Sequence, residues 1–303
     1  YVPGAVIDGF AIGIAIIIAA SQIKDLLGLD LAEVPAHFVE RVPALWGARD
    51  SLNPAALGVG IMTLGLILVL RRVFPRFPGL IVAVGLVSAA VALFDLPVDT
   101  LGSRFGALPD RLPMPGLPDV TLERMIALLP SALVIAFLAG VESLLSAMVA
   151  DRMIGGKTRA NAEVSAQGAA NIGSALFGGL PATGAIARTA TNVRAGGRTP
   201  VAGLVHALVI LAVMMLAAPL AGYLAMPALA ALLILTAWTM SEPHKWRGHL
   251  GLRRADQVLL GLTLVLTVVT DLTVAIGVGV TVGLAIRLRR REVPQADWTP
   301  PER

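Results

Sequence analysis

The feature that most constrains this chain is a series of apolar runs nearly free of charge, which are close to the length needed to cross a bilayer core. Only 15% of the residues are charged and 56% are hydrophobic, whereas soluble domains have about 25% charged residues. The expected fold class is therefore an all-α polytopic membrane protein. The runs are 9–23, 55–70, 80–94, 125–150, 164–180, 182–193, 201–240 and 258–286.

Two of these runs are too long for a single helix, so ten membrane segments are predicted. The run 201–240 should contain two helices, broken at Pro219 and Pro227. The run 258–286 should form two short helices that turn at Asp271, because one span would separate the basic tail from the other basic turns. The stretches 24–53 and 96–121 are rich in Pro, Asp and Gly and are expected to be exposed loops.

The basic residues indicate the orientation. Seventeen of the 24 Lys and Arg residues lie in alternate turns and in the tail, and six lie in the opposite turns. The positive-inside rule then predicts a multi-pass protein of the inner (plasma) membrane with both ends cytoplasmic. This placement explains the basic balance without a nucleic-acid partner. Because the chain begins at Tyr1 and no basic segment precedes the first run, we expect no signal peptide and a chain cut from a longer one.

The composition excludes several kinds of catalyst. The chain has no Cys and only four His, without paired His spacing, so disulfides, thiolate metal sites and a zinc enzyme are excluded. An intramembrane hydrolase would have only Ser146 and His206 as nucleophile and base, and neither lies in a catalytic turn. We expect no enzyme activity, cofactor or metal.

A break in the membrane helices is predicted between residues 177 and 192. The glycines Gly178 and Gly179, then Pro181 and Gly184, interrupt the helical hydrogen bonds between two short apolar segments. Such irregular backbone at membrane depth must face protein or a water-filled cavity. A half-helix starting near Thr183 is expected to follow the break.

The start of this half-helix is suited to bind an anion. Its unpaired N–H groups, including those of Ala185 and Ile186, carry partial positive charge, and Arg188 adds a full charge one turn later. Broken helices that present N-termini to anionic substrates recur in secondary transporters. In the alternative reading the helix is merely kinked and Arg188 extends to the interface beside Arg194.

A second intramembrane charge precedes the break. Glu142 and Ser146 are four residues apart and share a helix face, where they could line a cavity, bind Na⁺ or relay H⁺. Alternatively, a protonated Glu142 bonds a neighbouring helix. Gln167 and Asn171 have the same spacing and are expected to brace the broken backbone.

Together these motifs closely resemble the SulP anion transporter family. The matching residues are Glu142-Ser143-Leu144-Leu145-Ser146-Ala147 with Asp151, Gln167-Gly168 with Asn171, and Gly178-Gly179-Leu180-Pro181-Ala182-Thr183-Gly184-Ala185 with Arg188 and Asn192. The resemblance implies two inverted seven-helix repeats, of which this chain would hold helices five to fourteen. It implies the following division: gate helices five to seven in 1–95, the second half of the core in 122–218 with a half-helix near 183–193, gate helices twelve to fourteen in 219–290, and a cytoplasmic tail in 291–303 without a STAS domain.

The resemblance also implies a function. It indicates a homodimeric secondary transporter that carries a sulfate, bicarbonate or dicarboxylate anion by alternating access, through H⁺ or Na⁺ symport or anion exchange. Glu142 and Ser146 would form its coupling site. Some Na⁺-coupled members have an Asp at Glu142 and a hydroxyl at Ile186, which favours H⁺ symport or exchange here. A nucleobase permease of the same fold, or a non-transporting scaffold or inactive fragment, remains an alternative. The implied substrate site comprises Thr183, Gly184, Ala185, Ile186, Ala187 and Arg188.

Overall fold

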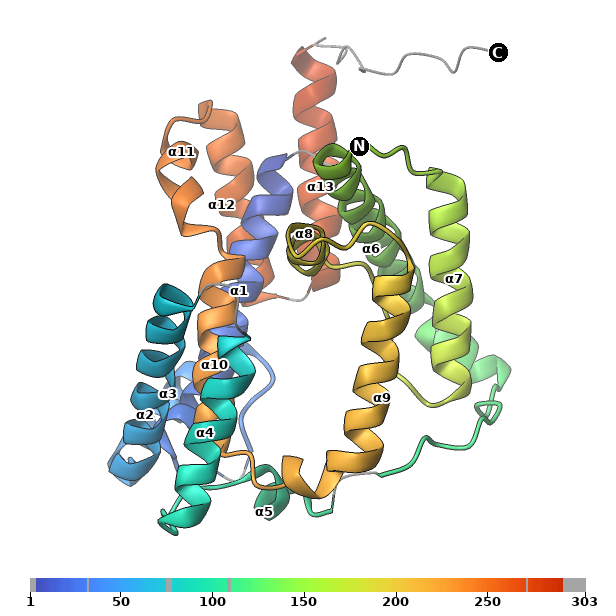
Figure 1. The fold of residues 1–303 in the computed structure, drawn as a ribbon. Coiled ribbons are helices and arrows are strands. Elements are labelled where there is room, and N and C mark those ends of the chain that lie inside the picture. The colour runs from blue at the N-terminus through green and yellow to red at the C-terminus, as the bar shows by residue number, and fades with distance from the viewer. Residues whose placement is uncertain (1–3, 32, 75–77, 108–109, 271, 291–303) are drawn as a thin grey trace. The chain divides into compact units, whose positions relative to one another are not determined.

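The computed structural model describes residues 4–31, 33–74, 78–107, 110–270 and 272–290, which contain helices and no strand (Figure 1). They divide into two compact units, one formed by residues 1–104 and 223–303 and the other by 105–222. The elements are α1 (Gly4–Leu27), α2 (Phe38–Gly47), η1 (Arg49–Ser51), α3 (Pro54–Val73), α4 (Gly79–Leu93), α5 (Leu101–Phe105), α6 (Leu122–Ile154), α7 (Ala160–Leu176), α8 (Ile186–Arg194), α9 (Val201–Ala221), α10 (Met226–Met240), η2 (Pro243–Lys245), α11 (Trp246–Leu250), α12 (Arg254–Val269) and α13 (Leu272–Arg290).

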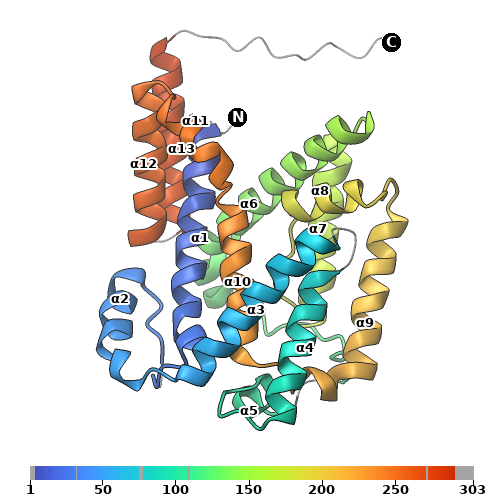
Figure 2. The same ribbon diagram turned by 60° about the vertical axis from the view of Figure 1, so that its left-hand side comes forward.

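The first unit is built around α1, which packs against α10, α12, α3, α2 and α13 (Figure 2). Small residues allow the closest of these contacts. A Cβ atom at Gly9 would overlap the carbonyl oxygen of Leu260, and one at Gly13 would lie 2.7 Å from Cβ of Thr267. Close backbone approach of this kind drives helix association in lipid, where the apolar surroundings give helices no hydrophobic reason to associate.

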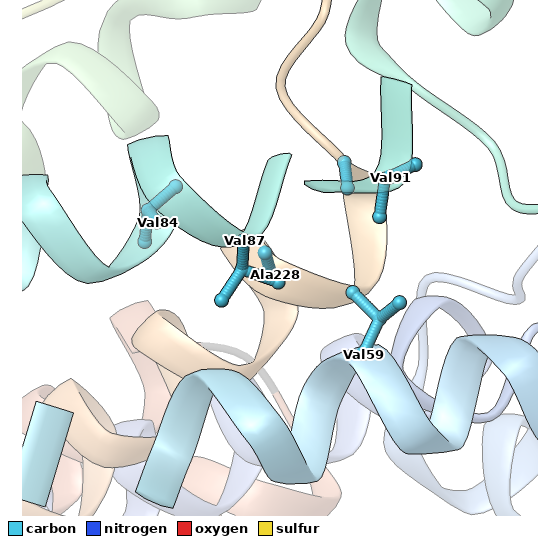
Figure 3. Close-up of a cluster of buried hydrophobic side chains, with 6 residues drawn as sticks. Val59, Val84, Val87, Val91 and Ala228 are labelled. Carbon is cyan, nitrogen blue, oxygen red and sulfur yellow. The ribbon is translucent and has the colours of Figure 1, made fainter. Parts of the chain in front are cut away.

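A valine cluster joins α3, α4 and α10 in the same unit (Figure 3). Val59 on α3 and Val84, Val87 and Val91 on α4 surround Ala228 near the start of α10, and all five are buried. The stiff β-branched side chains interdigitate with little loss of rotamer freedom. Packing therefore fixes the beginning of α10 against the α3–α4 pair.

The second unit contains α6, α7, α8 and α9, and within it α6 packs against both α7 and α8 (Figure 1). The long α6 ends at Gly155, whose φ of 71° closes the helix in the left-handed conformation. Asp151 then ties the α6–α7 turn, because its carboxylate accepts from the backbone N–H (2.7 Å) and hydroxyl (3.0 Å) of Thr158. The turn thereby holds α7 next to α6.

The predicted membrane segments correspond to helices of this structure. Among the described residues, α1, α3, α6 and α9 are each long and apolar enough to span a membrane, and α4 is a shorter apolar helix. The expected break at Pro219 is wrong, since α9 continues through that residue to Ala221. The interruption between the two helices lies between Ala221 and Met226, where α10 begins. Asp271 lies outside the described residues, but α12 ends at Val269 and α13 begins at Leu272.

The two stretches expected to be exposed loops are partly helical. The segment 24–53 contains α2 and η1, and 96–121 contains α5. The first expectation is wrong for a physical reason: Arg41 and Leu45 of α2 are buried against the first unit instead of facing water. The sequence did not indicate this helix because Pro43, a residue type that is common in loops, lies inside it.

Candidate anion-binding site at the broken helix

The break after α7 is a turn that leads into a loop and then into α8. Gly178 adopts a φ of 66°, which permits the chain to reverse directly after the helix end. The half-helix begins at Ile186, three residues later than the predicted start near Thr183. The later start has a tertiary cause, because the backbone N–H of Gly184 and the hydroxyl of Thr183 bond to α6 instead of joining a helical turn.

Asn171 and Gln167 brace the loop, as the sequence predicted. The Asn171 side chain accepts from the N–H of Ala182 (2.8 Å) and donates to its carbonyl oxygen (2.9 Å). The Gln167 amide donates to the same carbonyl oxygen, and the Ser174 hydroxyl donates to the carbonyl of Leu180 (2.8 Å). The side chains of α7 thus replace the backbone partners that the broken helix lacks.

Ser143 connects the three parts of the site. Its buried hydroxyl donates to Oε1 of Gln167 (2.9 Å) and accepts from the N–H of Gly184 (3.1 Å). Gly184 lies so close to α6 that an added Cβ atom would be 3.0 Å from Cα of Ser143. A glycine is therefore required for the loop to reach α6.

Two further polar pairs join α6 to the loop and to α8. The half-buried Glu142 lies beside Thr183, whose hydroxyl donates to the carbonyl oxygen of Ala139 at 3.2 Å. The buried Ser146 hydroxyl lies 2.5 Å from the hydroxyl of Thr189 on α8. The predicted coupling residues Glu142 and Ser146 therefore both contact the substrate-site segment.

The N-terminus of α8 is open. Its N-cap, Ala185, has no side-chain cap, and the first backbone bond of the helix runs from the N–H of Thr189 to the carbonyl of Ala185. The N–H groups of Ile186, Ala187 and Arg188 therefore have no partner within the helix. The Arg188 side chain is exposed, and it forms no ion pair among the described residues.

Two residues of this site, Ser143 and Thr189, were not predicted from the sequence. Ser143 was quoted only as part of a motif, although it bonds both Gln167 and Gly184, and Thr189 was not considered at all. Both residues carry a hydroxyl that bonds to another part of the site, and this polar group is the signal that could have identified them. The hydroxyl of Ser146, the nucleophile in the hydrolase alternative, pairs with the hydroxyl of Thr189.

The first unit contains a different polar cavity of about 540 Å³. Its main charged group, Arg104, pairs with Asp25 at 2.5 Å and with Asp99 at 3.2 Å. The Lys24 ammonium donates to the carbonyl oxygen of Leu31. Since its basic groups already have protein partners, we interpret this cavity as a structural network. No cluster of His, Cys, Asp and Glu suited to a metal ion occurs in the part of the chain that the structure describes.

Comparison with known proteins identifies the class of this molecule. The profile described as "Sulfate permease family" matches residues 1–263, and the chain belongs to that family. The homologous proteins are membrane transporters and not enzymes.

Two curated relatives illustrate the similarity. The chain is 41% identical over 292 residues to YvdB of Bacillus subtilis (strain 168), a protein named provisionally as a sulfate transporter, with 96% of this chain and 55% of the relative covered. It is 30% identical over 282 residues to the bicarbonate transporter BicA of Synechocystis sp., with 90% and 48% covered. The chain thus spans about half the length of the curated relatives it matches.

Solved structures confirm the fold. The transmembrane domain of a cyanobacterial bicarbonate transporter BicA matches with a TM-score of 0.75 at 29% identity, covering 90% of this chain and 68% of that one. The structure of SLC26A9 matches with a TM-score of 0.84 at 17% identity, covering 96% and 47%. The chain is therefore part of the helical inverted-repeat transporter fold, with a discontinuous half-helix.

Proposed function

We propose that the full-length protein is a secondary active transporter of a small anion of the sulfate, bicarbonate or dicarboxylate class. The observation that carries this proposal is the open N-terminus of α8 together with Arg188, which forms no ion pair with the residues that the structure describes. Both are positive, and both would be costly in a membrane without a negatively charged partner. The names of the relatives, sulfate and bicarbonate transporters, support an anion as that partner. Uptake of labelled anions into vesicles tests the proposal.

The substrate would bind at the start of α8, where backbone N–H groups and one guanidinium converge. Residues 183–187 would contribute their backbone and Arg188 its side chain. A nucleobase permease of the same fold is a weaker candidate, because a neutral base would leave the positive charge of Arg188 unbalanced.

The two compact units would serve as the moving parts of alternating access. We assign residues 1–95 and 219–290 to the gate and 122–218 to the second half of the core. The division of the chain at residues 104 and 222 supports this assignment. The protein would act as a homodimer in the bilayer, as the family resemblance implies.

Glu142 would couple transport to a cation, preferably H⁺. Replacing Glu142 with glutamine keeps the size of the side chain but removes the ionisable group. We expect anion uptake to persist while its dependence on an imposed pH or Na⁺ gradient falls. Glu123→Gln, an exposed position in the first turn of the same helix, is the matched control and should retain the dependence. An unchanged gradient dependence in a folded Glu142→Gln protein would make Glu142 structural.

The orientation would place both ends in the cytoplasm, on the evidence of the basic-residue distribution. Because the chain has no cysteine, single cysteines report their own positions without background. An impermeant thiol reagent added outside intact cells should label a cysteine at Arg111 and leave one at Lys157 unlabelled. The reverse labelling pattern would mean that the protein has the opposite orientation in the membrane.

A further inference from the structure

Helix α2 and η1 belong to the connection between α1 and α3, whose two ends meet at one point of the first unit. The N–H of Asn53 donates to the carbonyl oxygen of Leu27 at 2.9 Å, which joins the start of α3 to the end of α1. A Cβ atom at Gly28 would lie 2.7 Å from Cβ of Ala56, so the two ends are in close contact. The segment between them must therefore fold back on itself, and its direction depends on where α2 lies.

Arg41 shows that α2 folds back along α1. Its guanidinium is buried and donates to the carbonyl oxygens of Ile17 (3.2 Å), Pro35 (3.0 Å) and Ala36 (2.8 Å). Ile17 precedes the end of α1 at Leu27 by a helical length of about 15 Å at 1.5 Å per residue. The guanidinium thus lies well inside the depth that α1 spans, and it satisfies irregular backbone that would otherwise be unpaired there.

The neighbouring helices leave room for α2 at this depth. Helix α2 packs against both α1 and α12, and Figure 2 shows it below the lower end of α12. The 16 residues of α12 are about 24 Å long at 1.5 Å per residue, which is less than the roughly 30 Å of a hydrocarbon core. Helix α2 can therefore lie in the part of the membrane thickness that α12 is too short to span.

Helix α2 has one exposed face formed by three large apolar side chains. Val39, Val42 and Trp46 are spaced three and four residues apart on one face, and their exposed fractions are 56%, 47% and 71%. Arg41, which is charged, and Leu45, which is apolar, lie on a different face of the helix and are buried. The cation of Arg41 thus points into the protein, while Val39, Val42 and Trp46 point away from it together with Glu40, which is exposed in the first turn.

We propose that residues 33–53 form a re-entrant membrane element whose outward face, Val39, Val42 and Trp46, is covered by the acyl chains of membrane lipids. This face continues the apolar surface of the membrane spans beside it. Trp46 marks the boundary with the headgroups, because Arg49 lies over its ring at 5.2 Å and tryptophans concentrate at that interface. The tether is Arg41, whose bonds hold α2 at this depth.

Spin labels at single cysteines test the proposal in the full-length protein, reconstituted in vesicles of phosphatidylethanolamine and phosphatidylglycerol. A label at Val42 should collide several-fold more with oxygen, which partitions into lipid, than with a water-soluble nickel chelate. Ile61 on α3 and Asp50 in η1 provide the apolar-span and aqueous references, since both side chains are exposed. A label at Val42 that behaves like the one at Asp50 would overturn the proposal.

Two additional outcomes separate the alternatives. Low accessibility to both reagents, with dipolar broadening between labels, would mean that a second copy of the chain covers this face, and would overturn lipid as the occupant. Arg41→Gln in the Val42-labelled protein should shift the label toward the nickel chelate, because glutamine cannot bond all three carbonyls. A label that stays in lipid would contradict the role of Arg41 as tether.

Discussion

Replacing Arg188 with alanine is expected to weaken anion binding to the full-length protein by about 10- to 150-fold. A hydrogen bond to a charged group contributes about 1.5–3 kcal/mol, and each 1.4 kcal/mol corresponds to about tenfold in affinity. Arg188→Lys should recover part of the loss, because lysine keeps the charge but lacks the planar fork of the guanidinium. Calorimetric titration with sulfate and with bicarbonate measures both effects.

The matched control for Arg188 is Arg198→Ala. Arg198 is exposed in the turn after α8. Its replacement removes the same charge without disturbing the start of the half-helix. It should bind the anion as the wild type does. Equal affinities for wild type and Arg188→Ala would instead support the reading in which Arg188 merely extends to the membrane interface.

Replacing Asn171 with leucine should destabilise the broken helix and weaken anion binding together. Leucine has a similar volume but removes the acceptor for the N–H of Ala182, and a hydrogen bond of this kind contributes about 0.5–1.5 kcal/mol. We expect a lower midpoint of thermal unfolding, followed by circular dichroism, and a lower affinity in the same preparation. Asn161→Leu, exposed in the first turn of α7, should change neither. An unaltered midpoint in Asn171→Leu would remove the bracing role.

The sequence was sufficient to locate the break in the second unit because its causes are local. The close succession of Gly178, Gly179 and Pro181 disfavours a continuous helix locally, and Gln167 and Asn171 share a helix face by their spacing. The bonds of both side chains to Ala182 agree with that prediction.

The remaining details depend on contacts between distant residues. The half-helix begins at Ile186 because Gly184 bonds to Ser143, which is 41 positions away in the chain. Helix α2 was taken for a loop because its pattern is inverted, with Arg41 directed inward toward the carbonyl of Ile17. Neither feature has a periodic or compositional signal that one segment could supply.

The account depends most directly on whether the full-length protein moves anions at the α8 site. The decisive measurement is uptake of labelled sulfate, bicarbonate and dicarboxylate by vesicles that contain the wild type or Arg188→Ala, at several pH values and Na⁺ concentrations. We predict saturable uptake of at least one anion by the wild type, and a much higher half-saturating concentration for Arg188→Ala. Absence of uptake of every anion by the folded wild type, or identical saturation curves for the two proteins, would contradict the account.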